Sequence, residues 1–270
     1  MRRIAAILAI VLMLVFLAGC KAVFTNDTDR GGSHDNPSVA DDDTDDDTDD
    51  DTDDDSDDDI ETVSAALVYS YDEDIPQAYE SWAQNYAIEL DTYTISEIID
   101  VDLSPYDVVI LGEDADFGYH YLSYQHINES GKPVVAIYKG STYSNENGTH
   151  WYQFETDNCP VFDWEKSVVL DDTEDDVFTT PYTVQTDGGM LQITTNLQPA
   201  NACNNWNMPP DVTPVGVLLD PYTDYVAICY ESDWGIAFWG FDGTPTNMTD
   251  DAKKLLANIV HHAAGTVPRK

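Results

Sequence analysis

Two stretches of the chain decide the fold: YDVVILGED at residues 106–114 and GKPVVAIYKG at residues 131–140. In each, an apolar run of strand length leads to a glycine, Gly112 in the first stretch and Gly140 in the second. Near-continuous apolar runs are typical of strands that are buried on both faces, as in a parallel sheet. The pattern therefore predicts two buried parallel strands, at 106–111 and 134–138.

Outward from this centre, strand and helix patterns alternate. A strand is predicted at 65–71, and a helix follows because acidic residues and Pro76 stand where a first helical turn favours them. Residues 119–129 predict a second helix. The apolar positions of the first helix share one face and are expected to pack in the core; they are Ile75, Tyr79, Trp82, Tyr86 and Leu90.

The second half of the domain predicts less regular structure, followed by a clear end. Residues 141–215 are rich in Asn, Thr, Pro and Asp, which indicates insertions with antiparallel or edge elements. A closing helix is predicted from Thr249, an N-cap candidate, to Gly265, a C-terminal stop. The remaining strand candidates are 93–95, 215–219, 225–230 and 235–240. Such alternation indicates an α/β fold with helices on both faces of the sheet.

Together with GIAFWGFDG at residues 235–243, the two opening stretches resemble the class I glutamine amidotransferase-like superfamily. They are similar to the strand that enters the family's oxyanion glycines and to the strand that leads into its nucleophile elbow. GIAFWGFDG and the LLAN helix are similar to the last strand and the closing helix. The resemblance covers most of residues 64–265. It implies a flavodoxin-like three-layer sandwich with a mostly parallel central sheet and an irregular insertion.

The resemblance also implies where catalytic residues would stand, and this chain has other residues there. The nucleophilic cysteine falls at Tyr138, the histidine at Trp239 and the glutamate at Phe241. A phenol with a pKa of about 10 is a poor substitute for an activated thiolate. Ser141 lies near the elbow, but the final strand has no histidine to activate it. We therefore predict no glutaminase activity and no catalytic residue. The resemblance implies the fold of the family but not its catalytic activity.

Ligands of open α/β sheets bind beyond the carboxyl ends of the strands, which predicts a ligand site at that edge. Lys139 could hold an anion there, although an ion pair with Glu113 or Asp114 is the simpler interpretation. No cofactor or metal site is predicted. The candidate ligand-binding residues are Tyr71, Asp72, Gly112, Glu113, Asp114, Tyr138, Lys139, Gly140, Phe241 and Asp242.

Three functions fit this sequence. The first is a non-catalytic domain that binds a protein partner or a small ligand. The second is a hydrolase with unrelated, metal-assisted chemistry, for which DDTEDD at 171–176, His120 and His126 are the only raw material. The third is a structural subunit of an envelope complex.

The N-terminus predicts export and lipid anchoring. Residues 1–19 combine two arginines with an apolar run that is too short to favour a membrane span, and LAGC at 17–20 resembles a bacterial lipobox. The expectation is a signal peptide at 1–19 and a diacylated Cys20, which holds the protein at the membrane of a bacterial cell envelope. Because Lys21 and not Asp follows the cysteine, the resemblance implies the outer membrane.

The chain is strongly acidic, with 52 acidic and 11 basic residues and a formal net charge of −41. This charge excludes a nucleic-acid binder that works by neutralising phosphates. Fifteen of the acids lie in the run DDDTDDDTDDDTDDDSDDD at 41–59. We expect residues 20–59 to form a disordered tether, because they have too little apolar surface to fold and their like charges repel. The folded domain is predicted at 60–270.

Export also sets the redox environment of the remaining cysteines. Cys159 and Cys203 lie in loop-like sequence, and an oxidising compartment makes a disulfide between them plausible. Cys229 lies within the apolar run YVAICY and is expected to be a buried small hydrophobe. The spacing of these cysteines does not suit a metal site.

Overall fold

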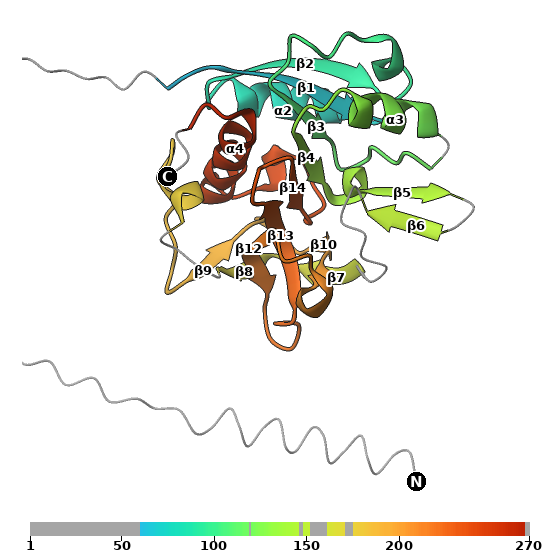
Figure 1. Ribbon diagram of the computed structural model, residues 1–270. Helices are drawn as coiled ribbons and strands as arrows, with labels where there is room; N and C mark the ends of the chain where they lie inside the picture. The colour runs from blue at the N-terminus through green and yellow to red at the C-terminus, as the bar shows by residue number, and fades with distance from the viewer. Residues whose placement is uncertain (1–59, 119, 146–147, 152–160, 171–174, 268–270) are drawn as a thin grey trace, which may run out of the picture. The chain divides into compact units, whose positions relative to one another are not determined.

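The computed structural model describes residues 60–118, 120–145, 148–151, 161–170 and 175–267 (Figure 1). The predicted signal peptide, the lipid attachment site Cys20 and the acidic segment lie outside these residues, so those interpretations stay predictions. In the described part of the chain, the helices are too short or too polar to cross a bilayer.

A single ten-stranded sheet organises the domain. Nine strands follow the order β2-β1-β3-β4-β14-β13-β12-β8-β9, and β11 pairs with β13. The strands from β2 to β14 are parallel to one another, and β14 pairs with β13 in the antiparallel sense. The main-sheet strands are β1 (Val63–Tyr69), β2 (Ile88–Thr94), β3 (Val108–Leu111), β4 (Val134–Ile137), β8 (Ser167–Leu170), β9 (Met190–Gln192), β11 (Cys203–Asn204), β12 (Val212–Leu218), β13 (Tyr225–Glu231) and β14 (Ile236–Trp239).

Helices cover both faces of the parallel half, which gives the predicted three-layer α/β fold (Figure 1). On one face, α2 (Asp74–Ala83) and α4 (Asp250–Ala264) pack on the sheet in a core that includes Leu67 and Trp239. On the other face, α3 (Tyr121–Glu129) packs through Ile127 against a second core cluster. Two small antiparallel sheets pair β5 (Thr142–Asn145) with β6 (Gly148–Trp151) and β7 (Val161–Glu165) with β10 (Gln198–Asn201).

The first predicted helix is shorter than its apolar stripe suggests. Ile75, Tyr79 and Trp82 are buried on α2 as expected, but the helix ends at Ala83. The chain then turns at Ala87, whose φ is 50°, and enters β2. The prediction of a helical stripe through Tyr86 and Leu90, with a strand only at 93–95, was therefore wrong. In the edge strand β2, polar residues alternate with a few apolar ones, and one of these, Leu90, was assigned to the helix because its spacing also fits a helical face.

The region 141–215 contributes more regular structure than its composition suggests. Among its described residues, β8 and β9 extend the antiparallel half of the main sheet beyond β12, and β10 pairs with β7 in a small separate sheet. The expectation of antiparallel or edge elements is confirmed. The region has more regular strands than the irregular insertion that was predicted. Short strands in Asn- and Thr-rich sequence give little periodic signal, because tertiary pairing holds them.

The closing helix is confirmed at both ends. Thr249 accepts a hydrogen bond from the backbone N–H of Ala252 at 3.2 Å, and Gly265 ends the helix in the left-handed region with φ of 75°. His261 and His262 belong to the last turn, but both are buried, and burial lowers the pKa of each. The His261 ring bonds through Nε2 to the Tyr86 carbonyl oxygen at 2.8 Å, and the His262 ring stacks on Trp234. The lowered pKa favours neutral rings over the cations that a helix C-terminus would otherwise attract.

The cysteines agree with the expectation as far as they are described. Cys229 is free and buried, and burial raises the pKa of its thiol. Cys203 is disulfide-bonded. Cys159 lies outside the described residues, so the pairing of Cys159 with Cys203 stays a prediction.

Candidate functional site

Four neighbouring parallel strands end at one edge of the sheet, which we call the carboxyl edge: the C-terminal ends of β1, β3, β4 and β14 and the residues that follow them. Every predicted ligand-binding residue belongs to it by position. The loop after β1 carries Tyr71 and Asp72, the loop after β3 carries Gly112, Glu113 and Asp114, the turn after β4 carries Tyr138, Lys139 and Gly140, and the segment after β14 carries Phe241 and Asp242.

Asp114 ties two of these loops together. Its carboxylate accepts hydrogen bonds from the backbone N–H groups of Ser70, Tyr71 and Asp72, at 3.0, 3.0 and 3.1 Å. Three charge-assisted bonds of this kind fix the loop after β1 against the loop after β3. Asp114 therefore has a structural role, while Tyr71, whose backbone it holds, is 79% exposed.

Glu113 is an acid buried in the protein interior. Only 7% of the residue is exposed, and its Oε2 accepts a hydrogen bond from the Tyr79 hydroxyl at 3.0 Å. The pKa of Glu113 is raised to about 7, chiefly by burial; hydrogen bonds from its own backbone and from Tyr79 oppose the rise, and the charges of Asp114 and Asp242 add to it. Near neutral pH this carboxyl is therefore poised between its protonated and ionised forms.

Tyr79 was predicted only as a core residue, and it also belongs to this site. It is fully buried on α2, and burial and the neighbouring Glu113 raise the pKa of its hydroxyl well above the usual value. The phenol therefore stays protonated and acts as a donor to Glu113. Its helical spacing gave no sign of this, because the partner lies 34 residues away in the sequence.

Asp242, which follows β14, and Lys139, which follows β4, are close enough for their charges to interact. Burial raises the pKa of the half-buried Asp242, whereas the charge of Lys139 and a hydrogen bond from the Gly243 backbone lower it. Lys139 itself is exposed, and its Nζ lies 5.9 Å from the centroid of the Tyr138 ring. Its backbone N–H donates to the Glu113 carbonyl oxygen at 3.3 Å. The edge thus places the carboxyl groups of Glu113 and Asp242, beside those of Asp72 and Asp114, together with one ammonium group.

The turn after β4 has the strained backbone of an elbow. Tyr138 has a φ of 45°, which L-residues rarely adopt, and its ring is buried. Gly140 is required for close approach, because a Cβ there would lie 2.7 Å from the carbonyl oxygens of both Leu111 and Gly112. Strain of this kind persists only where the surrounding structure holds it, and it clusters at functional sites.

Beside the elbow, the last strand is locked from both sides. Gly240 donates to the Ala227 carbonyl and accepts from the Asn201 N–H, both at 2.7 Å. Trp239 and Phe241 on either side are fully buried, so their side chains belong to the core. Asn201, which the sequence did not indicate, donates from its side-chain amide to the Tyr138 carbonyl oxygen at 3.3 Å. Within the described residues, Asn201 Oδ1 and Trp239 Nε1 lack hydrogen-bond partners.

The residues considered for metal-assisted chemistry do not come together in the described part of the chain. No group of three or more His, Cys, Asp or Glu side chains there has the arrangement of a metal site. His126 bonds through Nε2 to the Val101 carbonyl oxygen at 2.9 Å, and His120 precedes α3. Most of the DDTEDD run lies outside the described residues.

Comparison with known proteins defines the class of fold. No protein-family model and no curated protein matches the chain. Among solved structures, a candidate GMP synthase component from Thermoplasma acidophilum aligns with 75% of this chain and 95% of its own, at 11% identity and a TM-score of 0.50. The domain therefore has the fold of the class I glutamine amidotransferase-like proteins, and a similarity at this identity shows the fold alone.

Two further structures from Thermotoga maritima align over comparable lengths. PurLQS covers 74% of this chain and 99% of its own at 14% identity, with a TM-score of 0.44. A glutamine amidotransferase covers 75% of this chain and 98% of its own at 12% identity, also with a TM-score of 0.44.

Proposed function

We propose that the protein is a lipid-anchored component of a bacterial outer membrane whose α/β domain binds a protein partner or a small ligand at the carboxyl edge without hydrolysing glutamine. The observation that carries the proposal is the elbow. The turn has the strained backbone and the close-packed glycine, Gly140, that a nucleophile elbow needs. The residue at the position of the nucleophile is nevertheless the buried Tyr138.

The residues around the elbow support binding rather than glutamine hydrolysis. Trp239, where the resemblance implies a catalytic histidine, is fully buried and has no group that could take up a proton. Lys139, in contrast, is exposed and lies close enough to Asp242 to lower the pKa of that carboxyl. The exposed ammonium group of Lys139 and the half-buried carboxyl group of Asp242 offer a ligand both a cation and a hydrogen-bonding partner.

Ammonia release from glutamine tests the negative half of the proposal. The purified protein is expected to release ammonia no faster than buffer, and Tyr138→Cys is expected to remain inactive because Trp239 supplies no base. Glutamine-dependent ammonia release by the wild-type protein, lost in Tyr138→Phe, would contradict the proposal.

Substitution of Lys139 tests the positive half. In pull-downs from envelope extracts, Lys139→Ala is expected to lose the bound partner while its melting temperature stays within about 1 °C of wild type, because an exposed lysine contributes little to stability. Lys166→Ala removes another exposed lysine from the antiparallel half and serves as the matched control. Equal loss of partner in both variants, or retention in Lys139→Ala, would contradict a site at this edge.

The lipid anchor has its own test. Mass spectrometry of the mature N-terminus is expected to find an acylated Cys20, and Cys20→Ser is expected to release the protein from the membrane fraction. Sucrose-gradient separation of the two membranes then checks the outer-membrane assignment.

One observation favours a second candidate function, acid–base hydrolysis of a substrate other than glutamine. The carboxyl of Glu113, with a pKa of about 7, has the proton affinity of a general acid or base that operates near neutral pH. A panel of p-nitrophenyl esters and glycosides tests this candidate. Turnover that Glu113→Gln abolishes would favour it over pure binding.

A further inference from the structure

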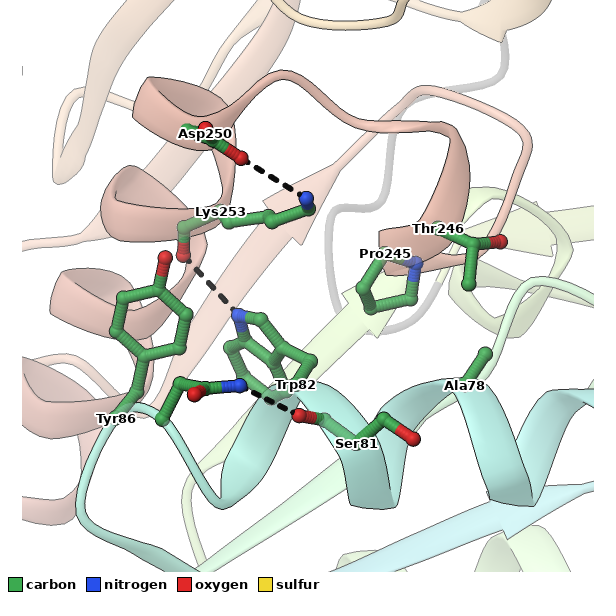
Figure 2. Close-up of a pocket in the computed structure, with 9 residues that line it drawn as sticks. Ala78, Ser81, Trp82, Tyr86, Pro245, Thr246, Asp250 and Lys253 are labelled. Atoms are coloured by element: carbon green, nitrogen blue, oxygen red, sulfur yellow. Dashed lines mark hydrogen bonds and ion pairs between the residues drawn. The ribbon is translucent and has the colours of Figure 1, made fainter.

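A cavity of about 370 Å³ lies away from the carboxyl edge, between α2, α4 and the short helix η5 (Pro245–Asn247) (Figure 2). Its aromatic wall includes Trp82, which is only 3% exposed and donates from Nε1 to the Lys253 carbonyl oxygen at 3.2 Å. At its rim, Asp250 and Lys253 form an ion pair at 3.1 Å. The lining residues therefore offer no open indole face and no unpaired charge, and we assign this cavity no ligand.

Exposed aromatic rings lie instead on the antiparallel half of the domain. The Phe162 ring of β7 lies 4.7 Å from the ring of Tyr222 and 4.8 Å from that of Tyr225, centroid to centroid, at the turn between β12 and β13. Trp206 stands on the neighbouring short helix η4 (Asn205–Asn207). Trp206 is 80% exposed and Tyr222 is 40% exposed. We call these four residues the aromatic surface; exposed aromatic side chains of this kind are the usual anchors of protein interfaces.

The backbone that carries Trp206 is held firmly. Its N–H donates to Asn204 Oδ1 at 2.9 Å, and the N–H of Asn205 donates to the Asp224 carbonyl oxygen at 2.9 Å. The preceding strand β11 pairs with the start of β13, and Cys203 in that strand is disulfide-bonded. The fold thus fixes the segment beneath an indole that it does not bury in its own core, so a partner would find this segment already ordered.

The charge of this region favours a cationic partner. Its segments, residues 161–162, 204–206 and 219–225, contain no lysine or arginine, and they carry the exposed acids Asp220 and Asp224. The formal charge of the whole chain, −41, attracts cations and repels anions, and it gives no advantage to a neutral ligand. An arginine guanidinium suits both features of the surface, because it stacks on aromatic faces and bonds to carboxylates, whereas a lysine ammonium is more strongly hydrated.

We propose that the aromatic surface docks an arginine-bearing segment of a basic partner protein. Guanidinium groups stack on Trp206 and Tyr222, and the carboxylates of Asp220 and Asp224 pair with them. β10 lies between this surface and the carboxyl edge, because it pairs with β7 and also bridges to Phe241. None of the four aromatic residues belongs to the carboxyl edge, so the failure of either proposal leaves the other standing.

Fluorine NMR of the full-length protein, labelled with 5-fluorotryptophan and kept in an uncharged detergent, tests the proposal at the surface itself. The chain has six tryptophans, and the Trp206 signal is assigned through its absence in Trp206→Phe. This local readout is needed because the acidic run at 41–59 attracts any basic peptide, so the peptides are added in excess.

The probes are a short capped glycine–arginine peptide, its lysine and glutamate counterparts, and the neutral sugar maltotetraose. The arginine peptide is expected to shift the Trp206 signal in a saturable way. The lysine peptide is expected to bind there at least about threefold more weakly, and the glutamate peptide and the sugar are expected to leave the signal in place. No shift with the arginine peptide, equal affinity for the lysine peptide, or a shift with the sugar alone would overturn the proposal.

Two variants decide whether this surface is responsible. Tyr222→Ala removes a ring and Asp224→Asn removes a charge, and each is expected to weaken binding of the arginine peptide by about threefold or more. The matched controls are Tyr121→Ala, which removes a tyrosine that is 54% exposed on α3, and Asp100→Asn, which removes an exposed acid; both are expected to bind as wild type. Melting temperatures confirm that all four variants fold. Unchanged binding in both Tyr222→Ala and Asp224→Asn, or an equal loss in the controls, would overturn the proposal.

Discussion

The carboxyl edge and the cavity between α2 and α4 differ in how their acidic side chains are solvated and paired. At the edge, Glu113 is only 7% exposed, next to other acids, and its pKa is about 7 as a result. At the cavity, Asp250 keeps 88% of its side chain exposed and has Lys253 as a partner. Burying an acid without a cation costs stability, whereas a solvated ion pair is nearly neutral in energy. The buried acid at the carboxyl edge therefore lowers the stability of the fold, whereas the ion pair at the cavity rim hardly changes it.

The largest expected effect comes from the backbone of the edge. In Gly240→Ala, the new methyl group would stand 1.9 Å from the Asn201 carbonyl oxygen and 2.8 Å from that of Ala227. Both are backbone atoms in paired segments, so the strands must separate. We expect a loss of about 3 kcal/mol or more in the free energy of unfolding, measured by urea titration.

The matched control for this variant is Gly118→Ala. Its Cβ would meet only the Asp116 side chain, at 3.2 Å, and we expect stability within about 0.5 kcal/mol of wild type. A small effect for Gly240→Ala would show that β14 is not held as tightly as the contrast between edge and cavity requires.

The buried acid gives the next largest effect, and its sign depends on pH. The pKa of Glu113 in the folded protein, about 7, exceeds the unfolded value of about 4.3. Between these values the folded state binds more protons, so stability falls as pH rises and the loss is complete above about pH 7. Glu113→Gln cannot ionise. At about pH 8 the variant is therefore expected to be more stable than wild type, by on the order of 3 kcal/mol, and the difference should vanish near pH 4.

Urea titrations at both pH values check this prediction. Glu129→Gln, on the surface helix α3, controls for the loss of one negative charge. If Glu113→Gln is no more stable than wild type at the higher pH, then the edge does not hold its carboxyl group against ionisation, and the proposed acid–base role loses its support.

The edge itself was largely predictable from the sequence, because its strands are buried on both faces and their apolar runs are continuous. The stretches around Gly112 and Gly140 placed the ends of β3 and β4 to within a residue or two. What composition could not provide is the long-range pairing of polar groups. That Asp114 would bond to the loop after β1, or Tyr79 to Glu113, depends on contacts between residues 34 or more positions apart.

The cavity was not predictable, for a related physical reason. Trp82 was assigned correctly to the core, but the stripe that included Tyr86 assumed a helix that continues. The helix ends at Ala83, and this change of direction places Tyr86 beside α4 instead of on the same helical face. Local periodicity does not contain the tertiary contact that stops a helix early.

The smallest effect separates two ion pairs in the first turn of α4. Asp250 and Asp251 each pair with a lysine three residues later, at 3.1 and 3.0 Å, and both are acids near a helix N-terminus. Only Asp251 also accepts a bond from the Gln185 backbone N–H, at 3.1 Å. Replacing either acid by Asn removes the same helix-dipole contribution. Asp251→Asn should therefore lower the free energy of unfolding by about 1 kcal/mol and Asp250→Asn by less than about 0.5.

Urea titration at low and high salt measures this difference. The effect of Asp250→Asn should disappear as salt screens the exposed pair, while that of Asp251→Asn should persist, because its bond to Gln185 anchors the chain that leads to β9 against α4. Equal effects for the two variants would mean that the rim of the cavity is stabilised as strongly as the half-buried pair next to it. The rim would then contribute to the free energy of unfolding, contrary to the expected difference between the carboxyl edge and the rim.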